Sequence, residues 1–189
     1  MLGHRAAVMF ADVVAWRSMA LEVAAASALW SSFTAKAELL GAAVMRTSSE
    51  ETAVSLLRET AREFACTASV ARRFSQIAEH GSRESDGPAT EVVAAGEFAV
   101  SETGSVAVDE PRSDRGMCFL AERLWLLVPE GEIVPSIDAA MLRMRELVQR
   151  GSPHPLLMSG PSRTADIERV LTVGVHGPRG LVIVVIGQG

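Results

Sequence analysis

Two stretches of this chain are apolar at every position, and they constrain the fold more than any other feature. Leu181–Ile186 has the sequence LVIVVI, and Leu124–Val128 has the sequence LWLLV before Pro129 ends it. A strand with one face in water alternates apolar and polar residues, so strands without polar positions are expected to be buried on both faces. Such strands need helices on both sides of their sheet.

Segments with helical periodicity alternate with these strands. Ser136 is the expected N-cap of one helix, and Gly151 follows its end. A strand is expected over Leu156–Met158 and a second helix over Thr164–Leu171. The alternation predicts an α/β fold with an open, mostly parallel sheet and helices on both faces. The expected buried side of the first helix consists of Ile137, Ala140, Met141, Met144 and Leu147.

The first half of the chain gives weaker signals. We expect an N-terminal helical segment over residues 1–32, and one α/β domain over residues 33–189 within a single-domain chain. Short strands are expected at Ala42–Met45 and Cys66–Ala71. Ser48 and Glu51 have the spacing of a capping box at the start of a helix between these strands. The buried stripe of that helix is expected to contain Val54, Leu57, Ala61 and Phe64.

Composition and charge exclude several classes of function. The net charge is −5 and the basic residues are dispersed, which argues against nucleic acid as a partner; the pair Arg72-Arg73 is interpreted as a solvated helix face. Cys66 and Cys118 have apolar neighbours, so buried free thiols are expected rather than a disulfide or an iron–sulfur cluster.

Neither a membrane segment nor a bound cofactor is expected. Charged residues interrupt the Ala-rich start of the chain, which predicts a cytoplasmic protein without a transmembrane helix. The histidines do not have metal-ligand spacing, so no metal is assigned. The sequence contains no Gly-rich dinucleotide fingerprint, P-loop or nucleophile elbow, and no cofactor is assigned.

The densest signal for a binding site is the segment GPSRTADIE at residues 160–168. It follows a strand, and a helix that opens at Ser162 or Thr164 would present free N–H groups to an anion. Arg163 would add a cation, whereas a helix cap without a ligand explains the same residues equally well. The candidate ligand-binding residues here are Gly160, Ser162, Arg163, Thr164, Asp166 and Glu168.

Two turns supply further candidates. The segment GVHGPRG places His176, suited to proton transfer near neutral pH, next to Gly177, which lets a ligand approach the backbone. A plain Gly/Pro turn explains this segment as well. The segment SETG presents the carboxylate of Glu102 beside Thr103 and Gly104, and an ordinary hairpin turn with a solvated Glu is the alternative.

Together, SETG at residues 101–104, IVP at 133–135, GPSRTADIE at 160–168 and GVHGPR at 174–179 resemble the LUD-domain family. The resemblance extends from about Gly96 to Ile186. It implies a fold similar to the NagB/RpiA/CoA-transferase group. It also implies a role beside partner proteins, one bearing iron–sulfur centres, in oxidising L-lactate to pyruvate. The chain departs from the family pattern at Ser101, where Ala is usual, at residues 121–125 and at Gly180.

Three hypotheses of function follow. The first is a non-redox accessory subunit of a lactate-oxidising system that binds a small organic anion or a partner protein. The second is an acyl- or CoA-transferring enzyme, because SETG is similar to the glutamate segment of class I CoA-transferases; Glu102 would be the nucleophile, and N–H groups near Gly104 would hold the oxyanion. The third is a metabolite-sensing regulatory protein. In each, Arg163 would hold the anion and His176 would transfer a proton.

Overall fold

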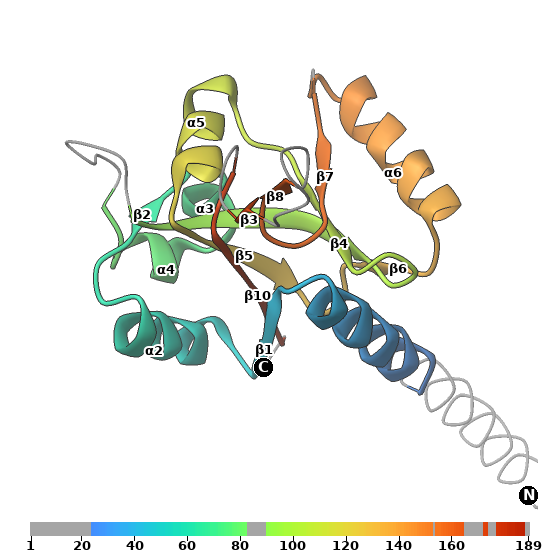
Figure 1. The fold of residues 1–189 in the computed structure, drawn as a ribbon, viewed down its shortest axis with the longest axis horizontal. Coiled ribbons are helices and arrows are strands. Elements are labelled where there is room, and N and C mark those ends of the chain that lie inside the picture. The colour runs from blue at the N-terminus through green and yellow to red at the C-terminus, as the bar shows by residue number, and fades with distance from the viewer. Residues whose placement is uncertain (1–23, 83–89, 153, 165–171, 174–176, 188–189) are drawn as a thin grey trace, which may run out of the picture.

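A computed structural model of the protein describes residues 24–82, 90–152, 154–164, 172–173 and 177–187 (Figure 1). Its strands form an eight-stranded sheet with the order β1-β10-β5-β3-β4-β7, and β2 and β6 both pair with β3. A separate two-stranded sheet consists of β8 and β9. The strands are β1 (Ala43–Thr47), β2 (Ala65–Cys66), β3 (Glu91–Val100), β4 (Ser105–Val108), β5 (Arg123–Pro129), β6 (Ile133–Val134), β7 (Leu156–Met158), β8 (Arg163–Thr164), β9 (Thr172–Val173) and β10 (Gly180–Ile186).

The large sheet is mostly parallel, as the apolar strands predict. Strands β1, β10, β5 and β3 run parallel to one another, and β4 pairs antiparallel with both β3 and β7. The two apolar stretches form adjacent central strands, because Leu181 pairs with Leu124 and Val185 with Val128. The expected hairpin of residues 98–100 and 106–108 is also present, although β3 begins earlier, at Glu91.

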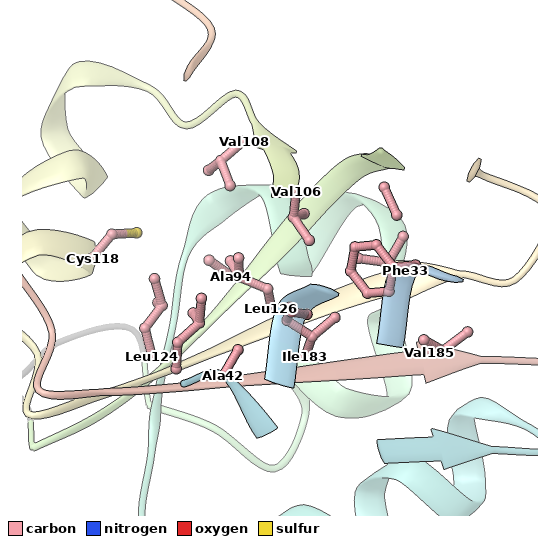
Figure 2. Packing of buried hydrophobic residues seen from close by; sticks show 14 of the residues in the cluster. Phe33, Ala42, Ala94, Val106, Val108, Cys118, Leu124, Leu126, Ile183 and Val185 are labelled. Atoms are coloured by element: carbon pink, nitrogen blue, oxygen red, sulfur yellow. The ribbon is translucent and has the colours of Figure 1, made fainter. Parts of the chain in front are cut away.

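Helices cover both faces of the sheet, which confirms the predicted fold class. The helices are α2 (Glu50–Thr60), α3 (Ala68–Arg73), α4 (Ser75–Ala78), α5 (Arg112–Leu120) and α6 (Ile137–Gln149), together with an N-terminal helix described over residues 24–39. Alternate residues of each central strand join different buried clusters. Leu126 and Ile183 pack with the N-terminal helix and α5 (Figure 2), whereas Leu127 and Val184 pack with α2, α3 and α4.

The helix α6 packs against the end of β3, where Phe98 and Val100 lie. Its N-cap is Ser136, as predicted, and the Ser136 side chain accepts a hydrogen bond from the backbone N–H of Ala139. Ala140 is fully buried against Phe98, but the expected buried side is only partly correct, because Ile137 and Met141 are exposed. A helix at the margin of a sheet buries a narrower stripe than a helix that crosses its centre.

The N-terminal helix is an integral part of the core. Trp30 and Phe33 are almost fully buried, and their rings pack edge to face with centroids 5.3 Å apart. The indole N–H of Trp30 donates to the carbonyl of Glu130, beyond β5. The predicted boundary between residues 32 and 33 falls inside this helix, and residues 1–23 lie outside the described residues.

Two local predictions in the first half were wrong. The N-cap of α2 is Ser49 rather than Ser48, and its capping-box partner is Thr52 rather than Glu51. The expected strand at Cys66–Ala71 ends at Cys66, and α3 begins at Ala68. The backbone N–H of Ala68 donates to the carboxylate of Asp114, so a distant residue satisfies the start of this helix. All four residues of the predicted buried stripe are buried, but only Val54 and Leu57 belong to α2, because the helix ends at Thr60.

Cys66 and Cys118 are both buried free thiols, as expected. Within the described part of the chain, no helix is long and apolar enough to cross a membrane. Likewise, no group of three or more His, Cys, Asp or Glu residues among those described is placed to hold a metal ion.

Candidate functional site

The turn at residues 101–104 packs closely against the N-terminal helix. Gly104 has a positive φ of 65°, and a Cβ at this position would lie 2.5 Å from the backbone nitrogen of Ala37. The hydroxyl of Ser101 donates to the carbonyl of Leu29 at 2.9 Å. The glycine and the serine therefore both serve the contact between this turn and the helix. An alanine at position 101 could not make this hydrogen bond.

Glu102 lies at the N-terminus of α6. Its Oε2 accepts a hydrogen bond of 2.8 Å from the backbone N–H of Ile137, the first residue of that helix. A carboxylate in this position satisfies a free N–H group and interacts favourably with the helix dipole. The backbone N–H groups of Thr103 and Gly104 donate to the carbonyl of Val100, so they are engaged within the turn rather than free for an oxyanion.

A short chain of hydroxyl groups joins this turn to the end of β7. Thr103 Oγ1 donates to Ser105 Oγ at 2.8 Å, and Ser105 Oγ lies 2.5 Å from Ser159 Oγ. The next residue, Gly160, has a positive φ of 80°, and a Cβ there would lie 2.6 Å from the carbonyl oxygen of Leu40. The end of the N-terminal helix therefore lies close to Gly160. The preceding turn of the same helix lies close to Gly104 in the hairpin turn.

The two glycine-rich motifs of the C-terminal half meet at Ser162. The backbone N–H of Ser162 donates to the carbonyl of Pro178 at 2.9 Å. A Cβ on Gly177 would lie 3.0 Å from the Cβ of Ser162, so the absence of a side chain permits this approach. Segments that are separate in the sequence therefore form one junction over a face of the sheet.

The helix expected to open at Ser162 or Thr164 is not present there. Arg163 and Thr164 form the strand β8, which pairs antiparallel with β9 through Arg163↔Val173 and Thr164↔Thr172. Backbone N–H groups in such a pairing are used between strands rather than presented to an anion at a helix start. The helix therefore does not start at Ser162 or Thr164; residues 165–171 of the expected helix lie outside the described residues, and the binding roles assigned to this segment stay a prediction.

The remaining predicted site residues are described only in part. His176, Asp166 and Glu168 lie outside the described residues, and the structure describes the backbone of Arg163 and Thr164. Of the candidates that are described, Thr103, Gly104 and Gly160 lie together near the N-terminal helix, and Ser162 lies beside Gly177. Glu102 lies on the far side of the turn, at α6.

Sequence reasoning missed a cleft of about 940 Å³ at the other end of β4. It lies between α3, the start of α5 and the segment that joins α6 to β7. Its arginines are Arg72, Arg112, Arg115 and Arg150, and its carboxylates are Asp109 and Glu110. Arg72 therefore lines a cleft, whereas Arg73 forms an ion pair with Glu97 at 3.0 Å. Because β4 has four residues, its two ends are separated by about 13 Å.

Glu110 is a buried carboxyl group within this lining, with only 3% of its surface exposed. Its Oε1 accepts hydrogen bonds from the hydroxyls of Thr67, at 2.7 Å, and of Ser69. Its Oε2 has no partner among the described residues. Burial raises the pKa of Glu110; the two hydroxyls oppose this effect, and the charge of Asp114 adds to it.

The topology defines an α/β protein with an open, mostly parallel sheet. The family model for the LUD domain matches residues 67–186, and the chain belongs to the LUD-domain family. The match includes the hairpin turn at residues 101–104, the junction at Ser162 and the whole lining of the cleft.

Two curated relatives have the name "Lactate utilization protein C". The chain is 32% identical over 98 residues to "Lactate utilization protein C" of Geobacillus thermodenitrificans, covering 50% of this chain and 41% of that protein. It is 37% identical over 92 residues to the protein of the same name from Deinococcus radiodurans, covering 47% of this chain and 42% of that protein. The chain therefore matches less than half the length of these relatives.

A solved structure has the same fold. The crystal structure of a DUF162 family protein from Deinococcus radiodurans superposes with a TM-score of 0.63 at 22% sequence identity. The similarity covers 86% of this chain and 98% of that chain. It extends beyond the curated matches and includes most of the first half, where the sequence signals are weakest.

Proposed function

We propose that this chain takes part in lactate utilisation as a component without a redox centre of its own, and that it holds a small organic anion near the junction of Ser162 and Gly177. The observation that carries the proposal is that the family match at residues 67–186 includes both loops of this junction. The shared name of the curated relatives supplies the pathway. Small side chains around the junction leave backbone groups accessible to a ligand.

The positions of the two thiols support a component that leaves electron transfer to a partner. Cys66 belongs to the cluster that packs with α2–α4, whereas Cys118 belongs to the cluster on the opposite face of the sheet. Burial raises the pKa of both thiols, and to about 12 for Cys66, so neither is readily ionised to a thiolate ligand. The redox centre would then reside in a partner protein that carries iron–sulfur clusters.

Acyl or CoA transfer through Glu102 is the alternative. Glu102 is exposed at the carboxyl end of β3, where a substrate could reach it. Its carboxylate already holds the start of α6, however, and the neighbouring N–H groups are engaged in the turn. We therefore favour a positioning role for Glu102. Mass spectrometry after incubation with several acyl-CoAs decides the matter, because a covalent adduct on Glu102 that is absent from Glu102→Gln would replace our proposal.

Growth of the host on L-lactate tests the proposal. Deletion of the gene should abolish growth on L-lactate and leave growth on glucose unchanged, and the wild-type gene should restore it. Gly177→Val places a branched side chain against Ser162 and should fail to restore growth. Gly131→Ala is the control, because a Cβ there has no neighbour within 4 Å.

Each outcome of this test has a defined meaning. Unchanged growth of the deletion strain would remove the pathway assignment, and binding of lactate without a growth defect would favour a metabolite-sensing protein. Full restoration by Gly177→Val, with the deletion strain unable to grow, would move the anion site away from the junction.

A further inference from the structure

The cleft beyond the end of β4 gathers positive charge on a chain whose net charge is −5. Four arginines line it, from α3, α5 and the end of α6, and two carboxyl groups lie among them. A concave site that concentrates charge opposite to that of the whole chain attracts a ligand of the complementary sign. The arginines are Arg72 from α3, Arg112 and Arg115 from α5, and Arg150 directly after α6.

Among the described residues, Arg72, Arg112 and Arg115 form no salt bridge. Arg150 has only a surface contact of 3.8 Å with Glu146, of the kind that contributes little. The four arginines outnumber the two carboxyl groups of the lining, and neighbouring guanidinium groups repel one another, so an anionic ligand would relieve this repulsion.

Arg115 is held in place by the backbone. Its Nε donates to the carbonyl of Glu110 at 3.0 Å, and its Nη2 donates to the carbonyl of His154 at 2.7 Å. A guanidinium has five N–H donors, so others stay free for a ligand. Ser152 donates to the carboxylate of Asp109, which ties the segment after α6 to the end of β4. A charged group fixed in this way loses little entropy when it binds.

Glu110 and Asp109 differ in how far a ligand in the cleft could reach them. Only 3% of Glu110 is exposed, and the hydroxyls of Thr67 and Ser69 donate to its Oε1. Its Oε2 is buried without a partner among the described residues, so it is not offered to the cleft as an acceptor. Asp109 is half-buried, and it is therefore the carboxylate of the lining that a ligand can reach.

The size and the charges of the cleft select a class of ligand. Several guanidinium groups suit a dianion with three or more oxygens, and their planar fork matches phosphate oxygens. A volume of about 940 Å³ holds a larger molecule than a three-carbon acid. The carboxylate of Asp109 would repel a bare phosphate, but it accepts hydrogen bonds from a hydroxyl group on an organic part.

We propose that this cleft binds an organic phosphate that also carries hydroxyl groups, as sugar phosphates and nucleotides do. The guanidinium groups hold the phosphate, and Asp109 accepts a hydrogen bond from a hydroxyl. The site is separate from the junction at Ser162 and does not depend on the proposed role in lactate utilisation.

Calorimetric titration of the full chain at low ionic strength, with inorganic phosphate and with ribose 5-phosphate as probes, tests the proposal. Both should bind, ribose 5-phosphate at least tenfold more tightly. The double variant Arg72→Gln/Arg112→Gln should weaken both about tenfold or more, since each lost charge-assisted hydrogen bond has about that effect. Arg58→Gln/Arg145→Gln removes two exposed arginines outside the lining and is the charge-matched control. It should leave binding within twofold of wild type.

A further variant tests the recognition of hydroxyl groups. Asp109→Asn should lower the affinity for ribose 5-phosphate toward that for inorganic phosphate, without weakening inorganic phosphate itself. Absence of binding by either probe, or equal binding by the cleft double variant and its charge-matched control, would overturn the site. Equal affinity of the two probes for the wild-type chain would overturn the assignment to a hydroxyl-bearing phosphate.

Discussion

Replacement of Gly104 by alanine is the most direct test of how the hairpin turn is built. The residue has a φ of 65°, in the left-handed region that disfavours a side chain. An alanine Cβ would lie 2.5 Å from the nitrogen of Ala37 and 2.7 Å from the carbonyl carbon of Lys36. Both are backbone atoms inside the N-terminal helix, so no side chain can rotate to relieve the overlap.

The expected loss of stability has two parts. Left-handed backbone costs an L-residue about 1–2 kcal/mol. Displacing the helix to make room costs about 1–3 kcal/mol, as overpacking of a core does. The free energy of unfolding should therefore fall by about 2–5 kcal/mol. In a domain of this size each kcal/mol lowers Tm by about 2–4 °C, so we expect Tm to fall by about 4–20 °C.

Urea unfolding of Gly104→Ala beside Gly151→Ala separates the two parts. Gly151 has a φ of 100°, but a Cβ there meets no atom within 4 Å, so this control carries only the backbone cost. Gly104→Ala should lose at least 1 kcal/mol more than the control, with an unchanged m-value. Equal losses in the two variants would refute the conclusion that the helix presses on this turn.

Three other perturbations have defined outcomes. Glu102→Ala should lower the free energy of unfolding by about 0.5–1 kcal/mol, and the difference should shrink in 1 M salt, because the carboxylate acts on the dipole of α6; calorimetry checks this. Cys66 and Cys118 should not react with iodoacetamide at pH 8 until the chain is unfolded, because both thiols are buried. Above pH 9 the free energy of unfolding should decline, because the thiols of the unfolded chain ionise while the buried Cys66, with a pKa of about 12, does not. Burial raises the pKa of Glu110, so the folded state holds this proton more tightly than the unfolded chain, and the stability of the wild type should decline as pH rises through the acid range. Glu110→Gln should remove this decline. Parallel curves of Tm against pH for the variant and the wild type would contradict the prediction.

The sheet could be predicted because its central strands carry the signal in every residue. Leu124–Val128 and Leu181–Ile186 have no polar position, and only a strand covered on both faces suits such a stretch. The N-cap Ser136 was predictable for a similarly local reason. The buried side of α6 was not, because its exposed Ile137 and Met141 depend on how far the sheet extends beneath the helix.

The candidate site was predictable where glycine marks a close approach. Gly104, Gly160 and Gly177 each lie where a side chain would collide with a neighbouring segment, so their clustering in the motifs has a physical cause. The strand β8 was missed because its pairing with Thr172–Val173 is tertiary, whereas the residues themselves have the composition of a helix start. The cleft was missed because Arg72 and Arg150 become neighbours only through the fold.

The contacts of the N-terminal helix with Gly104 and Gly160 show that the segment matched by the family model and the segment that folds as one unit have different boundaries. The match to the family model starts at residue 67, after that helix, β1 and α2, whereas the structural similarity to the DUF162 family protein covers 86% of the chain. Yet β1 pairs with β10 along five residues, and Leu57 of α2 is fully buried. A fragment cut at residue 67 would lose an edge strand and a layer of helix, leaving apolar surface in water. In this chain, residues 67–186 therefore lack part of the core that they need to fold, and a recombination event that transferred them alone would transfer an incomplete core.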